Sequence, residues 1–375
     1  MASACGCSGE GAPATPIEVL DCSTEAFKAA DKTRGAVFHA VDEAPVHKPG
    51  KKVTVVGAGQ VGVAVAYSIV NQGLCSELSL VDIAHDKVVG EALDLQHGSA
   101  FTKHVAVLGS SSYEISAGSD VVVITAGVRQ REGESRLDLV GRNLSVLQKI
   151  VPQVVRYSPG CVILVVSNPC DIMTWLVYKL SGFPKNRVLG SGTALDSSRF
   201  RTLVGQRLGV SPRSVHGYIV GEHGDSSVAC WSQLNVGGVP LKSRWPQLGD
   251  KDDPEAWYKV HEDVISAAGT VIRLKGYTSS GIGLTAASIV ECILRNDRRV
   301  IPVSTAARGF YGITQDVFLS LPCVVGSNGV RDICSMPLDE SEAAKLQASA
   351  STISKVQTPL KIEEAASASA ATSAE

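Results

Sequence analysis

The chain has 375 residues, of which 44% are hydrophobic and 19% are charged, proportions that suit a folded globular protein with a large core. Its 35 Lys and Arg residues stand against 37 Asp and Glu residues, and the resulting net charge of -2 gives no positive field to hold nucleic acid or an anionic membrane. No apolar run approaches the roughly 18 residues that cross a bilayer, and the ten cysteines follow neither a disulfide framework nor zinc-ligand spacing, so we expect no metal and a reducing compartment.

The two ends of the chain differ in composition from the rest. Residues 1–50 mix Gly, Ala, Pro and Ser, which predicts a flexible extension. They lack an apolar secretion segment and carry seven acidic residues, which disfavours an organelle transit peptide and favours a cytoplasmic location. A partner-binding or targeting role for the extension stays open. Residues 359–375, rich in Ala, Ser and Thr, predict a disordered tail.

Short apolar runs alternate with helical patterns between these ends. Residues 52–56 predict a first strand, 60–72 a helix that ends at Gly73, and 78–81, 121–125 and 162–167 further strands. Continuous apolar strands separated by helices indicate a doubly wound parallel sheet covered on both faces, here over 51–190. Beyond about 190 the pattern changes to longer helices and shorter, mixed strands. We therefore expect a second, α/β (α+β) domain over 191–358.

A glycine-rich hexamer, GAGQVG at 57–62, follows the first strand and opens the helix. Gly57, Gly59 and Gly62 allow a tight turn and bring backbone close to a pyrophosphate, whose charge meets the helix N-terminus. Asp82 ends the next strand, 20 residues after Gly62, where its carboxylate can accept hydrogen bonds from ribose hydroxyls and would repel a 2′-phosphate. This context predicts NAD rather than NADP. A turn without a ligand, with Asp82 as a cap, is the weaker alternative.

Four polar segments follow later strands or open a helix: GVRQREGESR at 127–136, SNP at 167–169, LDSSRF at 195–200 and GEHGD at 221–225. The first, polar and containing glycine, suits a mobile lid. Asp196 and Arg199 are three residues apart and share a helix face. Taken singly, these residues also allow structural interpretations. Asp196 could cap its helix and pair with Arg199, and Asn168 could make a turn.

Taken together, the motifs resemble the 2-hydroxy-acid dehydrogenase family that includes lactate and malate dehydrogenases. GAGQVG, TAG, Q-x-x-G-E-S-R, SNP, LDSSRFR, GEHGDSS and KGYTS occur in the family's order across roughly residues 50 to 350. The resemblance implies a Rossmann-type NAD domain, a substrate domain and a homotetramer. It implies cofactor contacts at Gly57, Gly59, Gln60, Val61, Gly62, Asp82, Thr125, Ala126, Gly127, Asn143 and Val166.

The resemblance also implies roles for five polar residues in reducing a 2-oxo acid. His223 is the expected general acid–base, since a histidine titrates near neutral pH. Asp196 is expected to orient its imidazole and stabilise the charged form. Arg199 is expected to bind the substrate carboxylate through two parallel hydrogen bonds. Arg136, on the lid, is expected to polarise the carbonyl, and Asn168 to hydrogen-bond beside it.

Substrate choice is expected to depend on Gln130, six residues before Arg136 on the lid. Malate dehydrogenases typically carry an arginine there, which neutralises a second carboxylate. With a neutral Gln130, burying that carboxylate unpaired would cost several kcal/mol, whereas pyruvate has only a methyl group. Thr278, in the KGYTS motif, is expected to complete a small pocket. These residues predict NADH-dependent reduction of pyruvate to (S)-lactate, with malate dehydrogenase as the alternative.

The sequence departs from the family pattern at two positions next to the expected pocket. Ser280 occupies a position where relatives often carry tryptophan, and Ala194 one where they often carry asparagine, so looser packing is expected beside the pocket. Arg201 and His216 match positions that bind a phosphorylated effector in some bacterial members, although a structural role is the preferred interpretation. A non-catalytic, NAD-binding structural protein is an alternative of a different class. It predicts damage to the catalytic set, which is complete here.

Overall fold

The computed structural model describes residues 50–128 and 136–360, and Arg136 by its backbone only. Almost all of the predicted extension over 1–50, most of the predicted tail over 359–375, and Gln130 lie outside the described residues. Among the described residues, no helix combines the length and apolarity that crossing a bilayer needs.

Six parallel strands form the first half of the main sheet, and they are β1(Lys52–Val56), β2(Glu77–Val81), β3(Ala106–Ser110), β4(Val121–Ile124), β5(Val162–Val165) and β6(Val188–Gly190). Their order across the sheet is β3-β2-β1-β4-β5-β6, so the direction of winding reverses between β1 and β4. A doubly wound sheet opens a crevice at that switch point, beyond the carboxyl ends of the strands. The predicted doubly wound parallel sheet is confirmed.

Helices connect these strands, namely α3(Gln60–Gln72), α4(His85–His97), α5(Arg136–Tyr157) and α6(Cys170–Ser181), with short 3-10 turns η1(Ser99–Phe101), η2(Tyr113–Ser116) and η3(Lys185–Arg187). Helix α3 has the predicted bounds. It buries Val65, Ile69 and Val70 at helical spacing. Gly73 ends it in the left-handed conformation, with φ 59°, where glycine carries no Cβ penalty.

The same sheet continues beyond β6 through the antiparallel strands β12(Arg299–Ala306), β13(Phe318–Gly326) and β14(Gly329–Ile333). Ser304 of β12 pairs with Gly190 of β6 and so joins the two halves. The expectation of shorter strands after residue 190 holds for five strands of two residues each, described below, but is wrong for β12, with eight residues, and β13, with nine. Pro302 and Pro322 stand opposite each other in this pair. Proline usually argues against a central strand, which hid both strands in the sequence.

The remaining helices of the second half are α7(Ala194–Leu208), α8(Leu241–Arg244), α9(Tyr258–Lys275), α10(Ser280–Arg295) and α11(Glu340–Gln357), with the 3-10 turns η4(Pro212–Ser214) and η5(Trp231–Gln233). Two small antiparallel sheets accompany them. One has the order β11(Val239–Pro240), β10(Asn235–Val236), β7(Val215–His216), and the other pairs β8(Ile219–Val220) with β9(Val228–Ala229). The loop between β8 and β9 carries the GEHGDSS motif.

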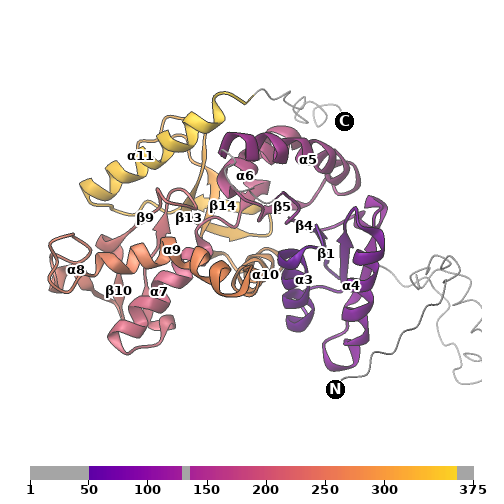
Figure 1. Ribbon diagram of the computed structural model, residues 1–375, viewed down its shortest axis with the longest axis horizontal. Helices are drawn as coiled ribbons and strands as arrows, with labels where there is room; N and C mark the ends of the chain where they lie inside the picture. Colours follow the sequence, from indigo (N-terminus) through magenta and orange to yellow (C-terminus); the bar gives the residue numbers. More distant parts are fainter. Residues whose placement is uncertain (1–49, 129–135, 361–375) are drawn as a thin grey trace, which may run out of the picture. The chain divides into compact units, whose positions relative to one another are not determined.

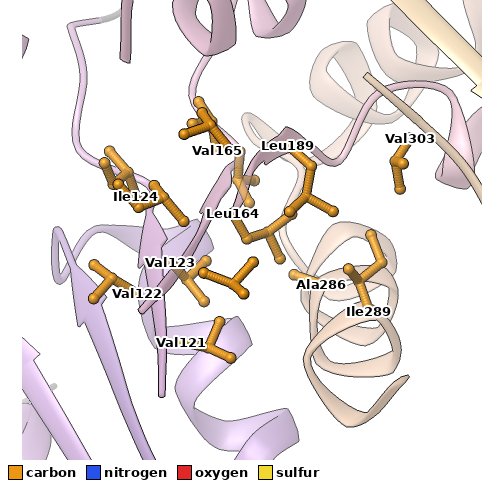
Figure 2. Close-up of a cluster of buried hydrophobic side chains, with 14 of the residues drawn as sticks. Val121, Val122, Val123, Ile124, Leu164, Val165, Leu189, Ala286, Ile289 and Val303 are labelled. Carbon is orange, nitrogen blue, oxygen red and sulfur yellow. The ribbon is translucent and has the colours of Figure 1, made fainter. Parts of the chain in front are cut away.

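Helix α10 belongs to the second half of the chain but packs against the first (Figure 1). Figure 2 shows Ala286 and Ile289 of α10 beside Val121, Val123 and Leu164 of the parallel strands, all buried. A Cβ at Gly283 of α10 would lie 2.8 Å from the carbonyl oxygen of Ala64 in α3, so the two helix backbones meet closely. Each fully buried aliphatic side chain contributes roughly 1.5–3 kcal/mol. The larger core therefore spans both halves, while a second, smaller core lies within residues 200–264 of the second half.

Candidate active site

The glycine loop at 57–62 forms a tightly packed cradle at the end of β1. Gly57 has φ 102°, and a Cβ there would lie 2.7 Å from the backbone nitrogen of Ala126. A Cβ at Gly62 would collide with the carbonyl oxygen of Gly57. At Gly59, in contrast, a Cβ would have no neighbour within 4 Å. Gly59 caps α3 without a side-chain hydrogen bond, which leaves the helix N-terminus to an anionic ligand.

Asp82 follows β2 at the same edge of the sheet, and two backbone groups hold its carboxylate. Oδ2 accepts a hydrogen bond of 2.6 Å from the N–H of Ala58, and Oδ1 one of 2.9 Å from the N–H of Ala84. The bond to Ala58 ties Asp82 to the glycine loop. The side chain is half-buried, so it can still meet a ribose. Asp82 can therefore bind the backbone of Ala84, as a helix cap does, and also accept hydrogen bonds from a ribose. The two roles that the sequence allowed for Asp82 are compatible.

The segments after β4 and β5 are tied to the glycine loop and to each other. Thr125 Oγ1 donates to Gly57 O at 2.8 Å, while Ser167 Oγ donates to Ala126 O at 2.6 Å. Asn143 of α5, fully buried, accepts from Val128 N at 2.8 Å and donates to Asn168 O at 3.4 Å. This network of hydrogen bonds ties Thr125 to Gly57 and Ser167 to Ala126, and Asn143 links Val128, after β4, to Asn168, after β5.

The other cofactor residues expected from the sequence lie around this network. A Cβ at Gly127 would approach Asn143 Oδ1 to 3.0 Å, so Gly127 lies against Asn143. Val166 is buried directly after β5, with its N–H bonded to Ile124 O at 2.8 Å. Gln60 is exposed and Val61 half-buried in the first turn of α3. All of them lie at the carboxyl end of the parallel strands or at the start of α3.

His223, in the loop between β8 and β9, pairs with Asp196 of α7 at 2.5 Å from Nδ1 to Oδ2. Because a carboxylate only accepts, Nδ1 carries the proton in this bond. Nε2 has no hydrogen-bond partner among the residues that the structure describes. The side chain is 25% exposed, so Nε2 is the nitrogen that can exchange a proton with a substrate.

Two carboxylates set the charge state of His223. Burial alone would lower the pKa of its imidazole, but Asp196 and then Asp171 outweigh burial, and the pKa is raised above its ordinary value. Burial would also raise the pKa of Asp196, yet His223 and Arg199 hold it below its usual range. The site therefore favours an imidazolium next to a carboxylate, which is the state that can donate a proton.

Arg199 lies one helical turn after Asp196 on α7, and its Nη1 donates to Asp196 Oδ1 at 2.8 Å. The ion pair between Asp196 and Arg199, which the sequence allowed as a structural contact, is thus present. Among the described residues, this is the one ion pair that Arg199 makes. Its side chain is 18% exposed, and a guanidinium has five N–H donors. Other N–H groups of Arg199 therefore remain for a carboxylate ligand.

Asp171, which no motif in the sequence indicated, fixes the backbone of the histidine loop. It is 2% exposed, its Oδ2 accepts from His223 N at 2.8 Å, and its Oδ1 accepts from Ser304 Oγ at 2.6 Å. Burial raises the pKa of Asp171 to about 6 despite these hydrogen bonds. The signal that could have found it was an acidic residue in the otherwise apolar helix CDIMTWLV, directly after the SNP motif.

A cavity of about 310 Å³ opens beside His223, lined by Leu139, Asn168, Pro169, Glu222, His223, Gly224 and Asp225. Leu139 lies in the first turn of α5, the helix that Arg136 begins. The side chain of Arg136 is not described, and Gln130 lies outside the described residues. Thr278 is half-buried between α9 and α10 and does not line this cavity. The structure thus brings His223, Asp196, Arg199 and Asn168 together.

Arg201 and His216 line a separate cavity of about 460 Å³. Arg201 Nε and Nη2 both donate to Pro212 O, at 3.3 and 3.2 Å, so the guanidinium fastens the turn η4 to α7. This contact favours the structural role over the effector site. Ser280 is exposed at the start of α10, and Ala194 is half-buried at the start of α7.

Comparison with known proteins gives one consistent result. The family model described as lactate/malate dehydrogenase, NAD binding domain matches residues 51–190, and the one described as lactate/malate dehydrogenase, alpha/beta C-terminal domain matches 193–363. The chain is 56% identical over 317 residues to the L-lactate dehydrogenase B chain of Sceloporus woodi, covering 84% of this chain and 95% of that protein. The L-lactate dehydrogenase B chain of Sceloporus undulatus matches to the same extent.

Proposed function

The chain belongs to the lactate/malate dehydrogenase family, and we propose that it is an L-lactate dehydrogenase, reducing pyruvate to (S)-lactate with NADH and running the reverse reaction with NAD. The observation that carries this proposal is the 2.5 Å pair of His223 and Asp196, with Arg199 bonded to the same carboxylate. It combines a proton donor and a carboxylate-binding cation in one site.

The glycine cradle fits the nucleotide, because Gly57 and Gly62 allow the backbone to turn tightly while the space next to Gly59, at the start of α3, is open. The N-terminus of α3 would hold the pyrophosphate and Asp82 the ribose hydroxyls. Gly59, Gln60, Val61, Thr125, Ala126, Gly127, Asn143 and Val166 would complete the binding site. When bound, NADH supplies the hydride that reduces the substrate carbonyl carbon.

His223 would transfer the proton that the reaction requires. In reduction, its Nε2 donates a proton to the carbonyl oxygen, and in oxidation it removes the hydroxyl proton of lactate. Asp196 fixes Nδ1, so Nε2 faces the substrate, and it stabilises the imidazolium before the transfer. Asp171 holds the backbone of the same residue by accepting a hydrogen bond from the N–H of His223.

Arg199 would bind the substrate carboxylate with the N–H groups that Asp196 does not use. Asn168, which lines the cavity beside His223, would hydrogen-bond near the carbonyl. Arg136, which begins α5, would stabilise the developing negative charge on the carbonyl oxygen. Gln130 would exclude a second carboxylate, and Thr278 would limit the size of the substrate side chain.

A steady-state comparison tests the reaction and the role of Gln130 together. We expect the purified chain to oxidise NADH with a higher kcat/KM for pyruvate than for oxaloacetate. Gln130→Arg should move the preference toward oxaloacetate, because the new guanidinium pairs with the second carboxylate. A wild-type preference for oxaloacetate would make this a malate dehydrogenase. Activity with neither substrate would favour an NAD-binding structural protein.

We further propose a homotetramer that acts in the cytoplasm, where it would regenerate NAD at the end of glycolysis through pyruvate fermentation, with an NAD domain over 51–190 and a substrate domain over 191–358. Large apolar side chains exposed on three helices support association: Tyr67 of α3, Leu274 of α9 and Leu284 of α10, which are 60%, 76% and 59% exposed. Sedimentation equilibrium would measure the mass, and a monomer at micromolar concentration would contradict the assembly.

A further inference from the structure

A closed ring of three hydrogen bonds lies behind the loop that carries His223. The N–H of Glu222 donates to Ser349 Oγ at 2.9 Å, Ser349 Oγ lies 3.0 Å from Ser226 Oγ, and Ser226 Oγ donates to Glu222 Oε2. Glu222 and Ser226 belong to the loop, whereas Ser349 belongs to α11, 127 residues away from Glu222 along the chain. Helix α11 packs against β9 and α6 (Figure 1).

The direction of each bond in the ring follows from counting protons. A hydroxyl has one proton to donate. Ser226 gives its proton to Glu222 Oε2, so Ser349 must donate to Ser226 while accepting from the N–H of Glu222. Every hydroxyl therefore donates once and accepts once. Removing the hydroxyl of Ser349 or of Ser226 therefore leaves the remaining hydroxyl and a polar group of Glu222 without a hydrogen-bond partner from the ring.

Burial makes the ring costly to break. Ser349 is fully buried and Glu222 is 1% exposed, and a buried polar group without a partner is penalised heavily. The ring also fits closely, since a Cβ at the preceding Gly221 would lie 3.1 Å from Ser349 Oγ. The loop is held further by the paired backbones of Gly221 and Ser320 and by Asp171, which binds the N–H of His223.

We propose that Ser349 is a positioning residue for the reaction, acting through Glu222 and Ser226 to hold the imidazole of His223 against Asp196. This inference rests on the proposed function. Ser349 is too deeply buried to touch a substrate, but it binds the N–H of Glu222, the residue directly before His223, while Asp171 binds the N–H of His223 itself. Two successive backbone N–H groups are thus anchored by two different helices, α11 and α6.

Loss of the ring is expected to lower the rate of the chemical step. In Ser349→Ala the peptide of Glu222 loses its anchor, and His223 samples positions farther from Asp196. Misplacing a catalytic group by about 1 Å can cost a factor of roughly 100, and since Asp171 remains, we expect kcat for pyruvate reduction to fall roughly tenfold. KM for NADH should not change, because the glycine cradle is separate from this loop.

Two further variants keep the test decisive if Ser349→Ala folds poorly. Ser226→Ala removes a hydroxyl of the same ring from a half-buried position and should lower kcat in the same direction. If both act through one ring, the double variant should be no slower than the slower single variant. Thr352→Ala is the matched control, since its exposed hydroxyl bonds, among residues 50–128 and 136–360, only to Ala348 O of its own helix, at 3.0 Å.

A second readout does not depend on the substrate. The charged groups that act on the imidazole are Asp196 and Arg199 from α7 and Asp171 from α6. Loosening the contact with Asp196 should lower the pKa of His223, followed by NMR titration of chains with 13C-labelled histidine and assigned by loss of the signal in His223→Asn. Ser349→Ala should lower this pKa, and Thr352→Ala should leave it unchanged.

The outcomes separate the two proposals. A lowered His223 pKa in Ser349→Ala and Ser226→Ala supports the positioning role even if the wild type fails to reduce pyruvate, which would overturn only the proposed function. Unchanged kcat and an unchanged His223 pKa in both variants, whether or not their melting temperature falls, would overturn the positioning role and leave the ring as a structural feature.

Discussion

Replacing Asp196 with asparagine tests the central pair of the site. Asp196 accepts from His223 Nδ1 at 2.5 Å and from Arg199 Nη1 at 2.8 Å, so the variant removes the one carboxylate that both cations share. Unit charges about 4 Å apart attract by about 4 kcal/mol at an effective dielectric constant near 20. Because the His223 side chain is 25% exposed, water screens part of this attraction. We take roughly half, about 2 kcal/mol, as the loss of imidazolium stabilisation.

A loss of about 2 kcal/mol corresponds to a roughly 30-fold slower reduction of pyruvate at neutral pH. The rate should also begin to fall at a lower pH than in the wild type, because His223 loses its proton more easily. Single-turnover measurements that follow NADH fluorescence from pH 5 to 9 would record both effects. Glu262→Gln, which removes a charge from an exposed position of α9, is the control. A rate within twofold of the wild type, with an unchanged pH profile, would refute the electrostatic argument.

The other predictions concern the cradle, the core and pH. Gly62→Ala should weaken NADH binding by roughly tenfold or more in a fluorescence titration, since the new Cβ collides with Gly57 O, whereas Gly90→Ala, with open space in α4, should bind normally. Ile289→Ala should lower the free energy of unfolding by about 2–5 kcal/mol in a denaturant titration, because it leaves a cavity in the core shared by both halves; a loss no larger than that of the exposed Leu274→Ala would contradict the shared core. Because reduction needs protonated His223, kcat/KM for pyruvate should fall as the pH rises through the raised pKa of His223. Because oxidation needs neutral His223, kcat/KM for lactate should fall as the pH drops through the same pKa. Steady-state assays of both reactions across the pH range should show these opposite trends.

Local signals in the sequence predicted the parts of the fold that are locally determined. The apolar run at 52–56, the glycine loop and the terminating Gly73 each act within a few residues, and the observed β1 and α3 have the expected bounds. Strands β12 and β13 could not be predicted from such signals, because Pro302 and Pro322 interrupt the pattern. Their pairing with each other and with β6 depends on partners distant in the chain.

The same distinction holds for the site. Motifs with fixed spacing pointed to His223 and to the neighbouring pair Asp196 and Arg199, and the structure brings these three side chains into contact. Asp171 and Ser349 were missed, because their partners lie 52 and 127 residues away in the chain. No spacing rule in the sequence predicts that Asp171, in an apolar helix, and Ser349, in the C-terminal helix, both bind the loop that carries His223. Only the folded chain brings them there.

The close packing of α10 on α3 also limits what recombination can do with this protein. The nucleotide-binding strands bury their apolar side chains beneath a helix encoded some 90 residues after the last of them, since β6 ends at Gly190 and α10 begins at Ser280. A gene fragment cut after residue 190 would leave Val121, Val123 and Leu164 uncovered and prone to aggregate. We therefore expect the nucleotide-binding half to fold poorly by itself, and a graft of it to need α10 as well.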